Sequence, residues 1–338
     1  MTRPTRVLVT GAGGFIGHHL VSRLKELGYW VRGADLKLPE HEPTRADEFL
    51  LLDLRVMQQA ERACDGMKEV YALASQMGGI GYIERAKATI MRDSVLIDTN
   101  TIEAARRAGA NRYLFTSSAC VYPGYRQLST DVTPLREEDA YPADAEDGYG
   151  WEKLFSERMC RHFTEDFGLE TRVVRFHNVY GPLGAWRGGR EKSIAAICRK
   201  VAEARDGDAI EVWGDGEQTR SYCYVDDAVD GLHRLMRSEH AQPLNIGQDR
   251  LVTVNQLVDI VAGAAGKRIG RVHMLDAPQG VRGRNSDNSR LREVLAWEPT
   301  VPLEEGVART YRWIEGQLRS VKESGDASPT LSGQEHAV

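Results

Sequence analysis

Residues 7–20, VLVTGAGGFIGHHL, decide the fold of this chain. They begin as a short apolar strand and lead into a helix predicted near Ile16–Glu26. Four glycines, Gly11, Gly13, Gly14 and Gly17, lie where the strand passes into the helix, and Phe15 and Ile16 among them are further candidates for binding the cofactor. Glycines here permit a tight turn and close approach to a pyrophosphate, whose charge the helix N-terminus favours. The stretch therefore predicts a dinucleotide-binding unit.

An acidic residue follows at the end of the next predicted strand. Asp35 lies 18 residues after Gly17, close to the spacing at which a carboxylate hydrogen-bonds the adenosine ribose and repels a 2′-phosphate. This spacing favours NAD over NADP as the cofactor. Asp53, in the stretch LLDLR, has two equal interpretations: a contact with the adenine, or a cap at the end of a strand.

Short β-rich runs alternate with helical patterns as far as Gly181. This alternation predicts an α/β fold with a Rossmann-type, doubly wound parallel sheet. The pattern changes beyond Pro182, where a Gly-rich loop and a helix are followed by a strand, a polar loop and another helix. This change predicts a second, smaller domain that is interleaved with the first.

The predicted boundaries follow from that change of pattern. The NAD-binding domain comprises residues 1–181 and 219–249, and the substrate domain residues 182–218 and 250–318. Residues 319–338 are polar and poor in apolar side chains, which predicts a disordered tail.

The composition of the chain argues against several classes of protein. A net charge of −5 argues against a nucleic-acid-binding protein, and no apolar run approaches the length of a membrane span. The five cysteines form no C-x-x-C pair, and the N-terminus lacks the apolar segment of a signal peptide. These features predict a cytoplasmic protein with no membrane contact and no metal site.

Two residues in the stretch DGYGWEKLFSE can together form a base. Tyr149 and Lys153 have i, i+4 spacing, so a helix places both on one face. A lysine ammonium there favours the phenolate of a tyrosine, which otherwise titrates near pH 10. Such a pair is common on solvated helices, but here it follows a predicted nucleotide-binding half and a strand that ends in serines.

Together with Ser118, these motifs resemble the extended short-chain dehydrogenase/reductases that act on nucleotide sugars. The blocks ASQMGGIGYI, SSACVYP, GYGWEKL, RFHNVYGPLGAWRGGREK, WGDGEQTRS, NIGQD and GVRGRNSDN are similar, in order, to those of the GDP-mannose 3,5-epimerase family. The resemblance implies conversion of GDP-D-mannose to GDP-L-galactose, with GDP-L-gulose from inversion at carbon 5 alone. It also implies that Ser118 shares the substrate hydroxyl with Tyr149, that residues 182–218 and 250–318 bind the GDP-sugar, and that the enzyme is a homodimer.

Inversion of two carbons needs one group that removes a proton and another that delivers one. Our candidates are Cys120 and Lys192, because a thiol and a partly desolvated lysine can both be shifted toward neutral pH. The resemblance implies that Cys120 is the base and Lys192 the acid, whereas the sequence alone leaves the direction open. The other four cysteines are interpreted as buried small hydrophobes.

Further polar groups are candidates for binding the substrate. Arg220 and Arg284 can bracket a diphosphate, since guanidinium groups bind phosphate oxygens in a bidentate manner. The resemblance adds other contacts: Gly78, Ser118, Ala119, Cys120, Asn178, Glu191, Lys192, Lys200 and Gln218. It implies weaker roles for His177, Arg190 and Arg282, and His177 is equally well interpreted as a core histidine.

Three alternatives accompany this prediction. A GDP-4-keto-6-deoxymannose 3,5-epimerase/reductase has a similar serine–cysteine block, but it uses NADPH and a histidine as the second acid/base group. A 4,6-dehydratase would carry a Thr/Ser–acidic pair where Ala119 and Cys120 stand. A non-catalytic NAD-sensing protein would typically lack Ser118 or the Tyr149–Lys153 pair.

Overall fold

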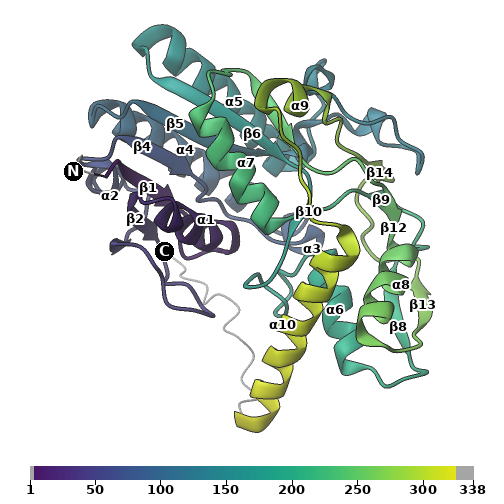
Figure 1. Ribbon diagram of the computed structural model, residues 1–338. Coiled ribbons are helices and arrows are strands. Elements are labelled where there is room, and N and C mark those ends of the chain that lie inside the picture. Colours follow the sequence, from purple (N-terminus) through teal and green to yellow (C-terminus); the bar gives the residue numbers. More distant parts are fainter. Residues whose placement is uncertain (1–3, 325–338) are drawn as a thin grey trace.

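The computed structural model describes residues 4–324 and contains a seven-stranded parallel sheet (Figure 1). The strand order is β11-β6-β5-β4-β1-β2-β3. The strands are β1 (Arg6–Thr10), β2 (Trp30–Asp35), β3 (Glu48–Leu51), β4 (Glu69–Ala72), β5 (Arg112–Ser118), β6 (Glu170–Phe176) and β11 (Pro243–Ile246). The order reverses between β1 and β4, and in open α/β sheets ligands bind outside the carboxyl ends of the strands at such a point. The predicted Rossmann-type fold is confirmed.

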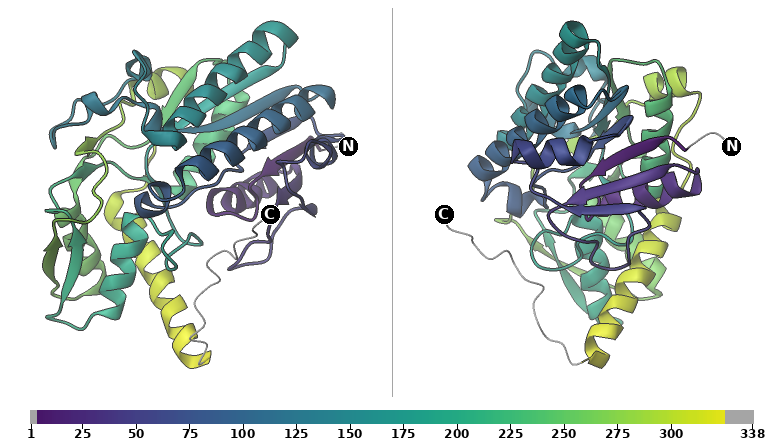
Figure 2. Two further views of the ribbon diagram at one scale, coloured as in Figure 1. Left: turned by 180° about the vertical axis from the view of Figure 1, so that it is seen from behind. Right: turned by 90° about the vertical axis from the view of Figure 1, so that its left-hand side faces the viewer.

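Helices cover both faces of this sheet (Figure 2). One face carries α1 (Phe15–Glu26) and α7 (Val225–Arg237), and the other carries α2 (Met57–Cys64), α4 (Lys87–Arg107) and α5 (Asp147–Phe167). The central strands are accordingly apolar on both sides, and Val7, Leu8 and Val9 of β1 are fully buried. Helix α5 ends at Gly168, whose φ of +71° gives the left-handed cap that terminates many helices.

The smaller domain lies beside the carboxyl edge of the sheet (Figure 1). Its helices are α6 (Ser193–Glu203), α8 (Val254–Ala265) and α10 (Leu303–Ser324). Its strands are β8 (Ala209–Trp213) paired with β13 (Gly270–Met274), and β9 (Thr219–Arg220) between β12 (Val252–Thr253) and β14 (Gly283–Arg284). The remaining elements are α3 (Ile80–Ile83), η1 (Ala119–Val121), η2 (Gly124–Arg126), η3 (Glu137–Ala140), α9 (Ser289–Leu295), and the strand pair β7 (Val179–Tyr180) and β10 (Cys223–Tyr224).

The structure divides the chain differently at two predicted boundaries. Strand β9 lies within the predicted segment 219–249, but it is hydrogen-bonded to β12 and β14 of the smaller domain. Residues 319–324 continue α10 instead of a disordered tail, because Leu318 packs on the core and Arg319 pairs with Glu315 one turn earlier. Residues 325–338 of the predicted tail lie outside the described residues. Within residues 4–324, no helix is long and apolar enough to span a membrane.

A buried ion pair fastens α5 to the sheet beneath the end of β5. Arg175 of β6 donates two hydrogen bonds to Glu157 of α5, from Nε at 2.9 Å and from Nη2 at 2.6 Å. The Ser117 hydroxyl donates to the same carboxylate at 2.5 Å. All three side chains are buried, so the carboxylate connects β5, β6 and α5 in a dry interior.

Replacing Glu157 by Gln is expected to lower the free energy of unfolding by about 3 kcal/mol, because it leaves the buried Arg175 guanidinium without its counter-charge. Urea unfolding measures this. The control is Glu165→Gln, on the same helix in an exposed pair with Arg161, with an expected change within about 0.5 kcal/mol. Equal losses in both variants would contradict the assigned role of the buried pair.

Candidate functional site

The glycine turn and Asp35 meet at the carboxyl end of β1. A Cβ on Gly17 would lie 2.1 Å from the Gly11 carbonyl oxygen, and Gly11 has a φ of +69°, so the turn requires both glycines. The Gly13 N–H donates to the Asp35 carboxylate at 2.9 Å. Asp35 therefore stands at the end of β2 beside the turn, as the spacing predicts.

The same turn fits the pyrophosphate of a dinucleotide. Gly14 is the N-cap of α1, no side chain caps that helix end, and its first turn contains no acidic residue. Free N–H groups and the helix dipole at such an end favour an anion. The Asp53 carboxylate accepts hydrogen bonds from the Arg55 backbone N–H and guanidinium. This local pairing leaves both interpretations of Asp53 open.

Ser118, Cys120 and Tyr149 come together where β5 meets α5. Ser118 ends β5, and its hydroxyl accepts the Cys120 N–H at 3.2 Å. The Cys120 carbonyl in turn accepts the N–H of Glu146, the N-cap of α5, at 2.8 Å. Tyr149 is buried one turn further along α5, and interactions with Lys153 and Ser118 lower its pKa while burial raises it more.

Two carboxylic groups lie behind the catalytic lysine candidate. Lys153 Nζ is 3.8 Å from Asp98 Oδ2 of α4 and 3.4 Å from Glu152 Oε1, and all three side chains are at most 3% exposed. The nearby carboxylates raise the pKa of Lys153 despite its burial. Burial raises the pKa of Glu152 to about 8, so Glu152 is protonated at neutral pH. This leaves Asp98 to balance the Lys153 charge.

Cys120 faces a guanidinium. Arg284 of β14 donates to Cys120 Sγ at 3.6 Å, to Gln127 Oε1 at 2.6 Å and to Glu146 Oε2 at 2.7 Å. Burial raises the pKa of the Cys120 thiol, with Glu146 adding to the rise and Arg284 opposing it. The Arg284 guanidinium is thus engaged beside the cysteine, although the sequence suggests that it brackets a diphosphate.

Lys192 lies on the other side of the domain junction. It is the N-cap of α6 and its side chain is solvent-exposed, yet desolvation by the surrounding protein lowers its pKa while the charge of Cys120 raises it. The preceding loop is anchored across the junction, since Gly79 N–H donates to Arg190 carbonyl oxygen at 3.0 Å and Arg190 stacks on Tyr82. Cys120 and Lys192 are therefore close enough to interact electrostatically.

The other predicted substrate contacts surround this junction. Asn178 and Lys200 donate to the carbonyl oxygens of Ser221 and Glu211, and Glu191 accepts from Gly189 N–H and Arg199. Gln218 is buried, and its Oε1 has no hydrogen-bond partner in the described structure, as expected for a group that faces a ligand. Burial and Arg284 lower the pKa of Arg220 to about 10.

Four further predicted residues are packed against, or paired with, neighbouring groups. Ala119 is buried in η1, and a Cβ on Gly78 would meet the Tyr82 ring at 2.8 Å. His177 is fully buried and hydrogen-bonded to Asn245. Burial lowers the pKa of His177 to about 3, which is typical of a core histidine. Arg282 is paired in a bidentate manner with Asp215.

Four partners of the site were absent from the sequence-based prediction: Gln127, Glu146, Asp98 and Glu152. Glu146 and Glu152 flank Tyr149 in sequence, which is a signal that could have drawn attention to them. Gln127 and Asp98 carry no local signal, because they reach Arg284 and Lys153 from distant segments.

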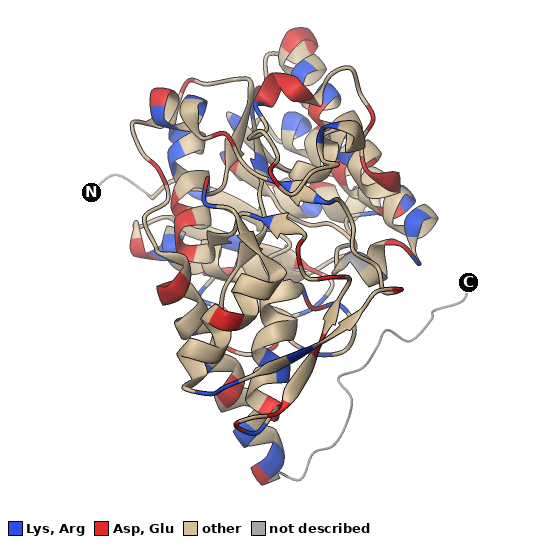
Figure 3. Ribbon diagram, turned by 90° about the vertical axis from the view of Figure 1, so that its right-hand side faces the viewer, with Lys and Arg blue, Asp and Glu red and all other residues tan. Residues whose placement is uncertain are grey.

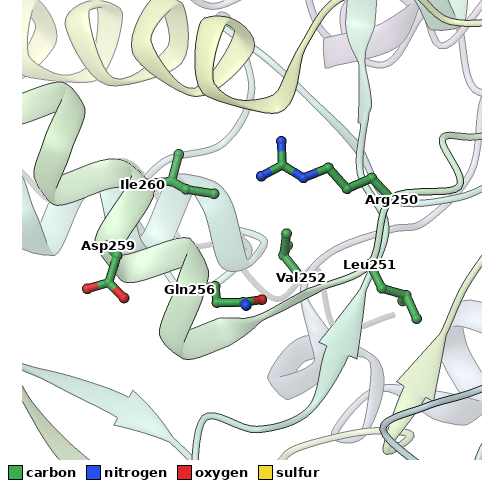
Figure 4. A pocket seen from close by; sticks show the side chains of 6 residues that line it. All are labelled: Arg250, Leu251, Val252, Gln256, Asp259 and Ile260. Atoms are coloured by element: carbon green, nitrogen blue, oxygen red, sulfur yellow. The ribbon is translucent and has the colours of Figure 1, made fainter.

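One hollow of the described surface lies away from the candidate catalytic groups. A hollow of about 290 Å³ beside α8 is lined by Arg250, Leu251, Val252, Gln256, Asp259 and Ile260, and none of the candidate catalytic groups lines it (Figure 4). Figure 3 shows Lys and Arg interspersed with Asp and Glu over the face that includes the smaller domain.

Comparison with known proteins identifies the family to which this chain belongs. A model of the NAD-dependent epimerase/dehydratase family matches residues 7–247. The chain belongs to the NAD-dependent epimerase/dehydratase family. Among solved structures, UDP-glucose 4-epimerase from Thermotoga maritima, solved with UDP-glucose, superposes with a TM-score of 0.84 at 29% identity, covering 93% of this chain and 100% of that one. NAD is the cofactor that the family and the glycine turn indicate.

Two plant proteins are more similar in sequence. GDP-mannose 3,5-epimerase 1 of Oryza sativa subsp. japonica is 45% identical over 322 residues, which cover 95% of this chain and 84% of the rice protein. GDP-mannose 3,5-epimerase of Arabidopsis thaliana is also 45% identical over 322 residues, covering 95% of this chain and 85% of the plant protein.

The Glu152 carboxyl gives this epimerase-family fold a pH-dependent stability. Its pKa is raised from 4.5 to about 8 in the folded protein, so the folded state binds more protons than the unfolded state between these pH values. Its contribution is fully present below pH 4.5 and is lost as pH rises to about 8. Glu152→Gln is expected to make the free energy of unfolding fall less steeply over this range.

Urea unfolding at a series of pH values measures that slope. The matched control is Asp166→Asn, an exposed carboxyl on the same helix, which should leave the slope of the parent protein unchanged. A Glu152→Gln slope equal to that of the parent would show that Glu152 is ionised in the folded state.

Proposed function

We propose that this chain is a GDP-mannose 3,5-epimerase that converts GDP-D-mannose to GDP-L-galactose and GDP-L-gulose. One observation carries the proposal: the Cys120 thiol lies beside the Ser118–Tyr149 pair and interacts electrostatically with Lys192 across the domain junction. Burial lowers the pKa of Lys192 toward neutral pH, as the sequence predicts, but it raises the pKa of the Cys120 thiol away from neutral pH, and the Arg284 guanidinium opposes that rise. The two plant relatives carry this activity in their names.

The chemistry begins at the 4-hydroxyl of the sugar. Tyr149 removes its proton, Ser118 shares the hydrogen bond, and Lys153, held as a cation by Asp98, favours the phenolate. NAD, when bound, would supply the hydride acceptor for carbon 4 and the hydride for its re-reduction. The glycine turn, Phe15, Ile16 and Asp35 would hold it, together with Tyr149 and Lys153.

A ketone at carbon 4 acidifies the hydrogens on carbons 3 and 5. Cys120 removes a proton from one face of the ring and Lys192 delivers one to the other, so the configuration inverts. Gln218, Arg220 and the groups around α6 bind the GDP moiety. Asn178, Glu191 and Lys200 line the same region and orient the sugar relative to these two residues.

Deuterium exchange tests the proposal. In heavy water, the holoenzyme should incorporate deuterium into GDP-mannose at carbons 3 and 5, followed by NMR, without net consumption of cofactor. Cys120→Ser should lower this exchange by at least about 100-fold, the usual contribution of a general acid or base. Cys64→Ala, which removes a buried thiol of α2, is the matched control.

The outcomes separate the alternatives. Absence of label at both carbons would refute the epimerase function. Consumption of NADPH with a 4-keto-6-deoxy substrate would instead identify an epimerase/reductase. Normal exchange in Cys120→Ser would exclude Cys120 from the proton transfers.

We also propose a homodimer that works in the cytoplasm. Helices α4 and α5 pack together and expose Met91, Leu96, Trp151 and Phe155, each more than 40% accessible. A second copy of the chain can cover this apolar helix pair. All five cysteines are free, which suits a reducing compartment.

Phe155→Glu is expected to convert the dimer to monomer, because it places a charge on the apolar face of the helix pair. Analytical ultracentrifugation measures the mass. Leu275→Glu, at an exposed apolar residue of the smaller domain, is the control and should leave a dimer. A monomeric parent protein would refute the assignment.

A further inference from the structure

We propose that Glu146 and Arg284 form a charge pair that sets the protonation state of Cys120, with Arg284 stabilising the thiolate and Glu146 opposing it while orienting Arg284. The inference deepens the proposed function, on which it rests for the role of Cys120 as a base. This role differs from the one that the sequence suggests for Arg284, which is a contact with the diphosphate.

The first argument is the geometry of the guanidinium. Arg284 is 6% exposed and directs each of its three nitrogens at a different acceptor: Nε at Gln127, Nη2 at Glu146 and Nη1 at the Cys120 sulfur. A planar guanidinium with two short hydrogen bonds to fixed acceptors has no freedom to rotate. The third nitrogen is therefore held against the sulfur.

The second argument is the double attachment of Glu146. Its N–H donates to the Cys120 carbonyl oxygen at 2.8 Å, and its carboxylate accepts from Arg284 at 2.7 Å. The residue thus fixes both the peptide of Cys120 and the cation beside its sulfur. Burial raises the pKa of the Glu146 carboxylate, but Arg284, Cys120 and Arg220 together bring it below its ordinary value, so the carboxylate stays ionised.

The third argument concerns the charges around the sulfur. Arg284 approaches from β14 and Glu146 from the N-terminus of α5, while Arg220 of β9, Lys192 of α6 and Tyr149 of α5 also interact with Cys120. Arg284 and Glu146 are the charged groups with the largest effects on the thiol, and their signs are opposite. Removing one of them leaves the other unopposed.

The opposite signs suit a residue that must both lose and regain a proton. Beside Arg284 alone the thiol would ionise more readily and hold an accepted proton less firmly, and beside Glu146 alone it would ionise less readily. With both charges in place, the Cys120 thiol can exchange a proton with a carbon acid and recover within each cycle. Glu146 is accordingly a positioning residue, and Arg284 is an electrostatic partner of the acid/base group.

Thiol alkylation of the full-length protein tests the pair without any catalytic turnover. Iodoacetamide reacts with the thiolate, and Cys120 is partly exposed whereas the other four cysteines are at most 1% exposed. The pH midpoint of Cys120 alkylation, followed by mass spectrometry, therefore reports its ionisation. Cys120→Ser should show no labelling at this site.

Glu146→Gln keeps an acceptor for Arg284 and removes the negative charge, so the alkylation midpoint is expected to fall by about one pH unit. Arg284→Gln removes the positive charge, and the midpoint is expected to rise by a similar amount. Arg284→Lys, a milder change that keeps the charge but loses the fork of hydrogen bonds, should give a smaller rise. Shifts of the same sign in Glu146→Gln and Arg284→Gln, or no shift in Glu146→Gln, would overturn the proposal.

Deuterium exchange distinguishes this proposal from the proposed function. In Glu146→Gln, the acidic limb of the exchange profile at carbons 3 and 5 should move to lower pH together with the alkylation midpoint. If alkylation shifts and no exchange occurs in any variant or in the parent protein, the epimerase function fails and the charge pair stands. If the parent protein exchanges normally and alkylation does not shift, the charge pair fails alone.

Discussion

The contact between the η1 turn and the N-terminus of α5 is the constraint on which the site depends. The Cys120 carbonyl oxygen accepts the Glu146 N–H at 2.8 Å, and Gly150 lies so close that a Cβ there would be 2.3 Å from the same oxygen. Any side chain at Gly150 would push α5 away from the strand end. Because the contact is this close, the hydroxyl of Ser118, the thiol of Cys120 and the phenol of Tyr149 share one small region.

Beneath that contact, the fold balances buried charges in pairs. Glu157 is matched by Arg175, Lys153 by Asp98, and Arg284 by Glu146. A buried charge without its partner is strongly destabilising, so each of these pairs resists change of either member. The site can therefore hold a lysine, an arginine and an ionisable thiol within one dry region without collapse of the packing around them.

The sequence predicted what depends on local pattern. The glycine turn, Asp35 and the spacing of Tyr149 and Lys153 are set within short segments, where backbone freedom and helical periodicity are decisive. The partners of Arg284 are not local: Gln127 is 157 and Glu146 is 138 residues away in sequence. Their role follows from how β14 is carried by the smaller domain to the end of β5. The pairing of β9 with β12 and β14 is likewise not local, because the three strands come from separate segments of the chain.

This arrangement explains why the chemistry sits between two domains. The oxidation groups are fixed to the sheet, where Ser118, Tyr149 and Lys153 have rigid supports, whereas Lys192 and Arg284 arrive from the smaller domain. The backbone of Cys120 follows directly after β5 of the sheet, whereas its charge partner Arg284 lies in the smaller domain. The ionisation of Cys120 therefore depends on how the two domains are placed relative to each other. For the proposed function, proton transfer by Cys120 would therefore require that the two domains meet, whereas the proposed oxidation groups Ser118, Tyr149 and Lys153 all lie in the larger domain.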